Sequence, residues 1–540
     1  MKKLISVIAA ALLLSAANVS AQLTTQRIVF DEKPSEYGYL AYKFVDENGN
    51  EIEPQYEESI SLFSSLPSYY RNENLTPVKN QGSEGCCWAF AMVGAMEASL
   101  IQQGYATPQN IDLSEAHMAY FGINLRDSVY NDGDASIGTQ AYSAGGNEYY
   151  ALAAMSKGSG AVSEYVAPYD EYTGENAKEV EEEKRFLAEA GINKFMPLSP
   201  ANHTAIKRAI MEYGSVLNSL YVGAGYYNSA NAAYHYDGAE TQNHQTLIVG
   251  WDDAYPKENF NEGMQPTSDG AWIVRNSWGE EFGEDGYMYV SYESTLKTIT
   301  AIEACLENEY DNNLGYTGGT TWNALQDIGI YGNVFTAKED EMLEAISVNL
   351  SNAADLNIRI YTDVQTIPVS GKLVKAITYQ TTGTYEKIPL DTPIKLSKGQ
   401  KYSVIVSGGT VMFEGPDSVR EISYNSGESY FYSGQWVDAG AQISLNGKLD
   451  ILGNFAIRAY TNDNKPKVTA LINNEKILAE SKYNDNAEIY IAQYDKNDVL
   501  IDVKKSTEAS LKENTTKYKV FSWNGKMHST TETAFVKGVN

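Results

Sequence analysis

Cysteine is scarce in this chain. Only three of its 540 residues are cysteines, Cys86, Cys87 and Cys305. Three thiols cannot build a disulfide framework or fill a four-thiolate zinc site, so at least one of them is free or is paired between chains. We predict no metal site and no cofactor.

Basic residues are also few. Lysine and arginine together number 41 against 70 aspartates and glutamates, which gives a formal net charge of −29. A charge of this sign and size repels nucleic acid and anionic lipid, and we expect neither as a partner. The hydrophobic content of 43% and the charged content of 21% are ordinary for a folded protein. The length predicts three or four domains.

Long hydrophobic runs are limited to one, at the N-terminus. Two lysines precede the apolar stretch 4–14, and Val19-Ser20-Ala21 offers a small-residue cleavage site. A membrane span needs about 20 apolar residues, so residues 1–21 are predicted to be a signal peptide. We expect no membrane span and an exported chain that is secreted, periplasmic or held at the cell surface.

Residues 22–65 form an N-terminal extension with two interpretations, a short pro-segment or an extra hairpin packed on the next domain. Residues 42–45 and 51–52 flank an acidic turn with an Asn-Gly step, which predicts a β-hairpin. The alternative is a calcium loop, which is disfavoured because the glycine is misplaced for one.

From residue 66 to 304, helical and strand patterns alternate. Apolar residues recur with helical spacing over 89–103, and Ser114 has the features of a helix N-cap. Strands are predicted at residues 245–251, 271–275 and 286–292.

Beyond Cys305 the pattern changes to short strands separated by turns. Residues 306–461 predict an all-β sandwich, and residues 466–540 predict a second, smaller β domain. The fold class is therefore α+β, with an all-β part after a mixed domain.

The stretch 76–90 carries the strongest chemical signal. A Gly/Ser-rich turn leads into the helix and places Cys87 at the helix N-terminus, where the dipole favours the thiolate. Six residues upstream, the amide of Gln81 can face a developing oxyanion. The alternative for Cys87 is a buried structural thiol.

Three segments together resemble the papain-like cysteine peptidases. Residues 81–90 read Gln-Gly-Ser-Glu-Gly-Cys-Cys-Trp-Ala-Phe, residues 243–251 begin with Asn-His-Gln, and residues 272–279 end in Arg-Asn-Ser-Trp-Gly. The resemblance covers about residues 66–300. It implies a papain-like, two-lobed catalytic domain over 66–304.

The resemblance also implies the catalytic residues. Cys87 takes the position of the nucleophile, and His244 that of the base that removes its proton and later protonates the leaving amine. Asn276 is expected to orient the imidazole, and Trp278 to shield that hydrogen bond from water. Gln81 would form the oxyanion hole with the backbone N–H of Cys87.

Substrate-binding residues follow from the same resemblance. Gly145 and Gly146 resemble the glycine pair whose backbone holds an extended substrate. Asn147, Gln242 and Asn243 are expected to approach the second subsite. Their polar character does not favour a strongly hydrophobic preference. Trp278 is also expected to bind substrate.

The sequence departs from the family pattern at its cysteines. Glu84 stands where the family usually has a disulfide cysteine, and Cys86 lies beside the nucleophile. A bridge between Cys86 and Cys305 is possible by count and is left open.

A weaker likeness continues downstream. Residues 333–347 and 389–406 resemble the lectin-like β domain of bacterial papain-like peptidases, which makes a glycan or cell-surface ligand of 306–461 an expectation by analogy. Tyr361, Tyr402 and Trp436 are candidates for an aromatic platform, although burial in the core is favoured for each.

The leading hypothesis is an exported cysteine endopeptidase that cuts proteins or peptides through a thioester acyl-enzyme. Two alternatives remain, a catalytically silent papain-fold protein that binds surfaces, and another Cys–His hydrolase such as a cell-wall amidase. The presence of Cys87, His244, Asn276 and Gln81 argues against the first. The Asn-Ser-Trp motif and the order of the motifs argue against the second.

Overall fold

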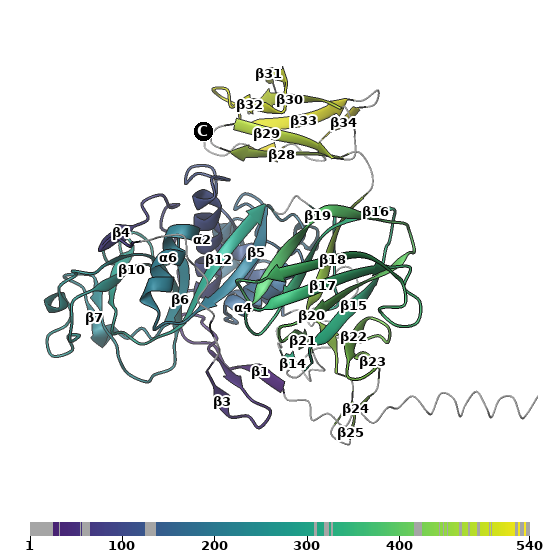
Figure 1. Cartoon of the computed structure of the whole chain (residues 1–540). Coiled ribbons are helices and arrows are strands. Elements are labelled where there is room, and N and C mark those ends of the chain that lie inside the picture. The colour runs from purple at the N-terminus through teal and green to yellow at the C-terminus, as the bar shows by residue number, and fades with distance from the viewer. Residues whose placement is uncertain are drawn as a thin grey trace, which may run out of the picture.

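The computed structural model covers most of the chain between Thr25 and Phe535 (Figure 1). It describes residues 25–31, 33–53, 56, 65–124, 137–306, 310–317, 323–325, 328–414, 424–441, 443–445, 448–450, 452–463, 467–473, 476–482, 487–495, 497, 499–523, 527–529 and 534–535. The predicted signal peptide, residues 1–21, lies outside the described residues. No helix in the described ranges is long and apolar enough to cross a membrane.

Three helices form the first lobe of the mixed domain. They are α2 (Cys87–Gln102), α3 (Glu115–Ile123) and α4 (Glu148–Ser156). Their buried side chains share one hydrophobic core. The helix predicted over 89–103 is confirmed, with its start two residues earlier. The predicted N-cap is also confirmed, because the Ser114 hydroxyl accepts a hydrogen bond from the His117 N–H at 3.0 Å.

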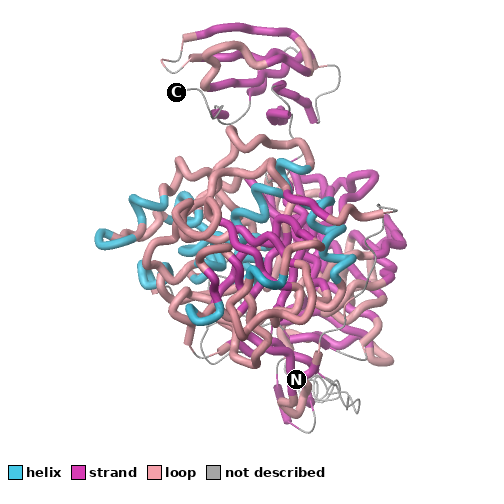
Figure 2. The backbone as a smooth tube through the Cα atoms, turned by 90° about the vertical axis from the view of Figure 1, so that its left-hand side faces the viewer, coloured by secondary structure: helices cyan, strands magenta, loops and turns pink. Residues whose placement is uncertain are grey.

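The second lobe is built on antiparallel strands. They are β6 (Val216–Leu220), β9 (His244–Asp252), β10 (Ala271–Arg275) and β11 (Tyr287–Ser291), with the short β4 (Tyr69–Arg71), β7 (Tyr227–Asn228) and β8 (Ala233–Tyr234) at their side. Helix α6 (His203–Tyr213) packs against β6 and β9 and shares their core. The strands predicted at 245–251, 271–275 and 286–292 are confirmed to within two residues. Figure 2 shows that the helices gather in this mixed domain.

A β-sandwich follows, as its short alternating runs predicted. One layer contains β13 (Asn312–Leu314), β16 (Glu341–Asn349), β19 (Tyr385–Leu396) and β27 (Ile457–Asp463). The other contains β15 (Ile330–Thr336), β17 (Asp355–Thr362), β18 (Lys372–Gln380), β20 (Lys401–Ser407), β22 (Ser429–Tyr432) and β23 (Trp436–Asp438). Apolar side chains of both layers meet in one buried core. The predicted all-β sandwich is therefore confirmed.

One hydrogen-bonded sheet joins the mixed domain to the sandwich. Strand β5 (Ala190–Leu198) pairs with β12 (Leu296–Leu306), which pairs with β6, and on its other side β5 pairs with β19. The β5–β19 register places Phe195 opposite Tyr385. Because the ladder crosses from one domain to the other, the two domains are held together by backbone hydrogen bonds.

The N-terminal segment reaches both domains. Strands β2 (Tyr42–Val45) and β3 (Glu51–Ile52) form the predicted hairpin, which is confirmed by their antiparallel pairing. Strand β1 (Thr25–Phe30) pairs with β2 on one side and with β14 (Asn323–Leu325) on the other, and the sheet continues through β21 (Met412–Glu414) and β26 (Asn454–Phe455). The hairpin therefore lies at one end of the molecule (Figure 1) and is anchored on the sandwich.

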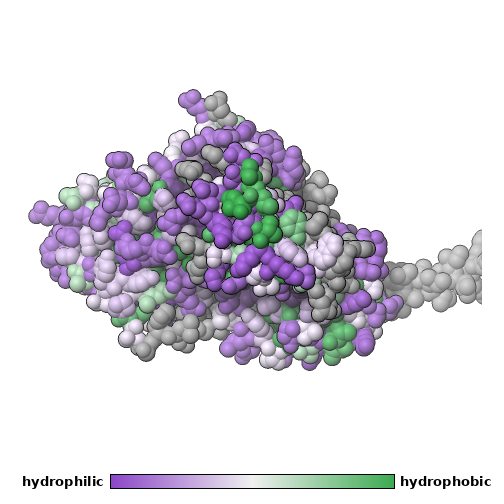
Figure 3. Space-filling model, turned by 90° about the horizontal axis from the view of Figure 1, so that it is seen from above, coloured by the Kyte–Doolittle hydropathy of each residue, from purple (hydrophilic) through white to green (hydrophobic). Residues whose placement is uncertain are grey.

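The C-terminal residues form a small β domain of two sheets. One contains β28 (Lys467–Asn473), β29 (Lys476–Lys482) and β32 (Glu508–Ser510), and the other contains β30 (Glu488–Tyr494), β31 (Leu500–Lys505), β33 (Lys517–Trp523), β34 (Met527–Ser529) and β35 (Ala534–Phe535). Seen from above, apolar side chains gather on this domain (Figure 3), where Val499, Leu500, Ile501 and Val503 are exposed.

Candidate active site

Cys87 is the first residue of helix α2, and its side chain is fully buried. The thiol lies within reach of the backbone N–H groups of Gln245, Trp88 and Cys87 itself, each of which favours the thiolate. Burial outweighs them and raises the pKa of the thiol to about 12. In this closed arrangement Cys87 is a protonated thiol.

His244, the first residue of β9, is joined to Asn276 directly after β10. Its Nε2 lies 2.8 Å from the Asn276 Oδ1, which also accepts a hydrogen bond from the Ser277 N–H at 2.8 Å. Because an amide oxygen can only accept, Nε2 must carry the imidazole proton and Nδ1 is left as the acceptor. Among the described residues, Nδ1 has no hydrogen-bond partner. It is therefore available for the thiol proton.

Two aromatic rings cover the imidazole. The Trp278 ring stacks on it with a centroid distance of 4.8 Å, and the Tyr37 ring meets it edge-on at 5.2 Å. Burial lowers the pKa of His244 to about 4, against the opposing effect of the hydrogen bond that the imidazole donates to Asn276. At neutral pH the closed site therefore holds a neutral imidazole beside a neutral thiol.

Gln81 is oriented by a residue that the sequence analysis did not single out. The Ser277 hydroxyl donates to the Gln81 Oε1 at 2.7 Å, and the Ser277 carbonyl accepts from the Gln81 backbone N–H at 2.9 Å. With Oε1 occupied, the Nε2 group turns the other way and donates to the Tyr37 carbonyl at 3.3 Å and to the Glu84 carbonyl at 2.8 Å. The only sequence signal for this role is the position of Ser277 next to Asn276.

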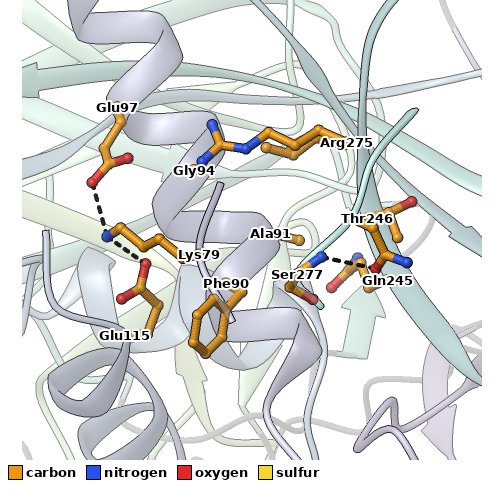
Figure 4. Close-up of a pocket in the computed structure, with 12 residues that line it drawn as sticks. Lys79, Phe90, Ala91, Gly94, Glu97, Glu115, Gln245, Thr246, Arg275 and Ser277 are labelled. Atoms are coloured by element: carbon orange, nitrogen blue, oxygen red, sulfur yellow. Dashed lines mark hydrogen bonds and ion pairs between the residues drawn. The ribbon is translucent and has the colours of Figure 1, made fainter. Parts of the chain in front are cut away.

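The loop before Gln81 is held by a buried ion cluster. Lys79 contacts Glu97 at 3.2 Å and Glu115 at 2.7 Å. Figure 4 shows these three side chains beside a small cavity of about 20 Å³ against helix α2. The cluster fixes the loop to helices α2 and α3, which carry Glu97 and Glu115.

The glycine pair is occupied by the chain's own N-terminal segment. The Gly146 N–H donates to the Gly38 carbonyl at 3.0 Å, and the Leu40 N–H donates to the Gly146 carbonyl at 2.8 Å. Tyr39 thereby pairs in parallel with Gly146. Substrate was expected on this glycine pair, and the sequence carried no sign that residues 35–41 of the chain itself would occupy it.

The segment also fills the oxyanion position. The Tyr37 carbonyl accepts from the Cys87 N–H at 3.4 Å as well as from the Gln81 amide. Gly38 lets the segment run past Gly85. Its φ of +85° favours glycine, and a Cβ would come within 1.9 Å of the Gly85 backbone. Only glycine lets the two backbones approach this closely.

The two asparagines expected near the second subsite have other partners. The Asn147 side chain caps helix α4 through the Tyr149 N–H and donates to the Leu40 carbonyl at 2.7 Å. The Asn243 side chain is paired with the backbone of Val222 through both of its amide atoms. Asn147 therefore reaches the bound segment directly, whereas Asn243 does so through its backbone carbonyl, which accepts from Ser35.

All three cysteines are buried, and none of them forms a disulfide. The Cys86 sulfur lies 3.1 Å from the Tyr169 hydroxyl, and the Cys305 sulfur accepts from Lys387 at 3.5 Å. The bridge that the cysteine count allowed is not formed. Within the described ranges, no group of histidine, cysteine or acidic side chains could hold a metal ion.

Two segments of the chain match known protein families. Residues 68–310 match the family model of the papain family cysteine proteases, and residues 309–461 match that of a lectin like domain. The chain therefore carries a papain-family cysteine protease domain followed by a lectin-like domain.

The papain-family domain is similar to several animal cathepsins. It is 28% identical to cathepsin J of Mus musculus over 252 residues, which are 44% of this chain and 64% of that protein. It is 30% identical to mouse cathepsin K over 226 residues, which are 41% of this chain and 57% of that protein. The chain thus spans less than two thirds of the length of these curated relatives.

Both domains have a counterpart in one solved structure. The cysteine protease and lectin-like domains of Cwp84, a surface layer associated protein of Clostridium difficile, align with a TM-score of 0.62 and 24% identity. The alignment covers 81% of this chain and 98% of that chain. A structure of the clostridial protease Cwp84 after propeptide cleavage aligns with a TM-score of 0.59 and 24% identity, over 72% of this chain and 97% of that one. This likeness concerns the fold.

Proposed function

We propose that the chain is an exported cysteine endopeptidase whose catalytic residues are Cys87, His244, Asn276 and Gln81. The observation that carries the proposal is the 2.8 Å contact between the His244 Nε2 and the Asn276 Oδ1. It fixes the imidazole tautomer so that Nδ1 receives the thiol proton. The papain-family match over 68–310 supports the same assignment.

The reaction follows from these positions. The thiol proton passes to the His244 Nδ1, and the Cys87 thiolate attacks the carbonyl carbon of the substrate. The Gln81 amide and the Cys87 N–H bind the resulting oxyanion. As the peptide C–N bond breaks, the imidazolium returns the proton to the leaving amine, and a thioester remains. Water, deprotonated by His244, then hydrolyses the thioester and restores the thiol.

Residues 22–65 act in this proposal as a pro-segment that keeps the peptidase closed. The Tyr37 carbonyl takes the place of the substrate carbonyl, and residues 38–40 take the place of an extended substrate on Gly146. No water-accessible surface remains on Cys87 or His244 while the segment is bound. The solved Cwp84 structure after propeptide cleavage is of a protein that undergoes such a removal.

A variant pair tests the proposed activity. Both variants are made in the background of Gly38→Val, in which a side chain collides with the Gly85 backbone and opens the cleft. In that background Cys87→Ala should abolish peptide hydrolysis and labelling by a thiol-directed epoxide. Cys305→Ala, which removes another buried thiol, one in contact with Lys387, serves as the control and should keep both. Turnover retained by Cys87→Ala would refute the endopeptidase assignment. Loss of turnover in both variants would show that folding, and not the nucleophile, had been lost.

The lectin-like domain supplies the second proposed interaction, with a glycan of a cell surface. Of the three aromatic candidates, Tyr402 is buried in the core, which excludes it as a binding platform. Trp436 is half-buried and lies 5.6 Å, centroid to centroid, from the exposed Tyr432 ring. A glycan array probed with the full chain and with its Trp436→Ala variant tests this role. No binding by the full chain would refute it.

Export and a surface location belong to the same proposal. The Cwp84 relative is described as a surface layer associated protein, and the N-terminal residues 1–21 have the pattern of a signal peptide. N-terminal sequencing of the exported precursor would fix the cleavage after residue 21, and sequencing of the mature protein would fix the cleavage that removes the pro-segment.

A further inference from the structure

One phenol fastens the loop that carries Gln81 to the first lobe. Tyr169 begins the short helix α5 (Tyr169–Tyr172) and is buried in the core of that lobe. Its hydroxyl donates to the Gln81 backbone carbonyl at 2.8 Å and lies 3.1 Å from the Cys86 sulfur. The phenol therefore joins the residue that supplies one proposed oxyanion donor to the residue directly before the other, Cys87.

The three groups form a chain of hydrogen bonds with one direction. A carbonyl can only accept, so the single phenol proton goes to Gln81, and the Cys86 thiol donates to the phenol oxygen. Burial raises the pKa of Cys86, so the thiol keeps the proton that it donates. Because Cys86 is the N-cap residue of helix α2, the chain of hydrogen bonds runs from the start of the catalytic helix to the peptide group of Gln81.

Tyr169 itself is held on several sides. Its ring meets the Phe90 ring edge-on with a centroid distance of 4.9 Å. Its backbone N–H donates to the Glu164 carboxylate at 2.6 Å, and its carbonyl accepts from the Thr173 hydroxyl at 2.8 Å. With ring and backbone both packed, the hydroxyl is a fixed point on which a catalytic loop can be positioned.

The peptide group of Gln81 is consequently fixed from both lobes. Its N–H donates to the carbonyl of Ser277 in the second lobe at 2.9 Å, and its carbonyl accepts from Tyr169 in the first. The side-chain amide that would bind the oxyanion grows from this backbone. A donor stabilises a developing charge most when its position is set before the reaction begins.

No disulfide shares this task, because none of the three cysteines forms one. The loop has one other contact with the region after helix α5, from the Gly174 N–H to the Glu84 carboxylate at 3.1 Å, and it is exposed to solvent. A hydrogen bond that water can replace contributes less than a buried one. Within the described residues, the buried phenol is the stronger of the two contacts.

We propose that Tyr169 is a positioning residue for the oxyanion hole, whose hydroxyl holds the Gln81 amide and the Cys87 N–H at the spacing that one substrate oxygen requires. The inference rests on the proposed function, since it concerns the same reaction. Tyr169 acts through Gln81 and touches no substrate. A tyrosine that only stabilised the fold would change the free energy of unfolding and leave the binding of the oxyanion as it is.

The test compares two tyrosines of helix α5 in the full chain carrying Gly38→Val, the variant that opens the cleft. Tyr169→Phe removes the hydroxyl and keeps the ring. The matched control is Tyr172→Phe, which removes the hydroxyl of another buried tyrosine, one that donates to the Glu181 carboxylate at 2.6 Å.

We expect Tyr169→Phe to lower kcat by about 10-fold with KM unchanged, in keeping with one well-formed buried hydrogen bond. The affinity for a peptide aldehyde, whose adduct with Cys87 places a tetrahedral oxygen at the two donors, should fall by the same factor. In the Gln81→Ala background the phenylalanine should add nothing further. Tyr172→Phe should change none of these values. A loss of kcat that persists without Gln81, or one that Tyr172→Phe shares, would overturn the inference.

Alkylation of Cys87 by iodoacetamide distinguishes the two ways of failing. The reaction forms no oxyanion, so Tyr169→Phe should leave its rate unchanged. Normal alkylation together with unchanged kcat and unchanged aldehyde affinity would overturn the positioning role alone. Alkylation of the Gly38→Val chain without any peptide hydrolysis would overturn the endopeptidase function.

Cys86 decides the matter if Tyr169→Phe does not fold and Cys87 cannot be alkylated selectively. Cys86→Ala removes the donor to the phenol and should lower kcat at an unchanged alkylation rate of Cys87. Cys86→Ser keeps a donor at the same place and should retain the kcat of the Gly38→Val chain. Equal kcat in the alanine and serine variants would overturn the inference.

Discussion

The backbone N–H of Cys87 donates to the backbone carbonyl of Tyr37, with the nitrogen and oxygen 3.4 Å apart. The residue that we propose as the nucleophile thus holds a carbonyl of its own chain. This contact links the catalytic helix to a segment that begins on the lectin-like domain, because β1 pairs with β14.

The first prediction concerns the imidazole. Asn276→Ala removes the acceptor that fixes the His244 tautomer. We expect kcat to fall by about 10²-fold with little change in KM, because a general base in the wrong tautomer loses that order of rate. Steady-state kinetics on one peptide substrate would check this. A rise in KM at unchanged kcat would place Asn276 in substrate binding instead.

The second prediction concerns Ser277 as a positioning residue. Gln81→Ala should lower kcat by about 10²–10³-fold through the loss of one oxyanion donor. Ser277→Ala should lower it less, since the amide remains but is no longer held by the 2.7 Å hydrogen bond to its Oε1. In the double variant the serine should add nothing further. Additive losses would show that Ser277 acts independently of Gln81.

The third prediction is that acid opens the closed form. With the segment bound, burial lowers the pKa of His244 to about 4, whereas an exposed imidazole has a pKa near 6.5. Between pH 4 and pH 6.5, the open form therefore carries a proton on His244 that the closed form lacks. Lowering the pH from 6.5 to 4 shifts the equilibrium toward the open form. The titratable side chains beside the imidazole are Tyr37 and Cys87, and both stay neutral over this range because burial raises the pKa of each.

Labelling of Cys87 carried out at each pH, relative to the labelling of the opened variant Gly38→Val at the same pH, would measure this opening. Because the pKa of His244 differs between the closed and the open form, lowering the pH from 6.5 to 4 can raise the labelled fraction of Cys87 by up to about two orders of magnitude. A labelled fraction that does not change, or that falls with acid, would contradict the assigned burial of His244.

The fourth prediction concerns the anchor on the lectin-like domain. Ile28 is 3% exposed on β1, and Ile28→Asp would bury an unpaired carboxylate there. We expect β1 to detach from β14 and the labelling of Cys87 to rise at least about 10-fold. Arg27→Asp, on the exposed side of the same strand, is the control and should leave the rate unchanged. Equal rates in both variants would show that the anchor does not hold the cleft closed.

The sequence anticipated much of the catalytic domain, because its signals are local. A glycine-rich turn before an apolar helix locates Cys87, and short motifs locate His244 and Asn276 on neighbouring strands. In the structure His244 is hydrogen-bonded to Asn276, and the Cys87 N–H and the Gln81 amide donate to the same carbonyl, that of Tyr37. The helices and strands were also predicted closely, since hydrophobic periodicity reflects which side chains are buried.

The closed cleft was not predictable in the same way. Residues 35–41 have no pattern that marks them as an occupant, and their contacts with Gly85, Gly146 and Asn243 join positions far apart in the chain. The pairing of Phe195 with Tyr385, which joins the two domains in one sheet, is equally nonlocal. Such contacts depend on how the helices and strands pack against one another, and no local pattern in a single sequence predicts them.

The most direct test of the account compares two glycine variants in the full chain. Gly38 and Gly49 both have a positive φ, +85° and +83°, but a Cβ at Gly38 meets the Gly85 backbone, whereas a Cβ at Gly49 meets nothing within 4 Å. Both valines therefore strain the backbone, and only Gly38→Val expels the segment from the cleft. The measurement is the rate at which a thiol-directed epoxide labels Cys87, with the site identified by mass spectrometry. We predict rapid labelling of Gly38→Val, together with peptide hydrolysis, and slow labelling of both the native chain and Gly49→Val. Equal labelling of all three proteins would contradict the proposal that residues 35–41 close the catalytic site.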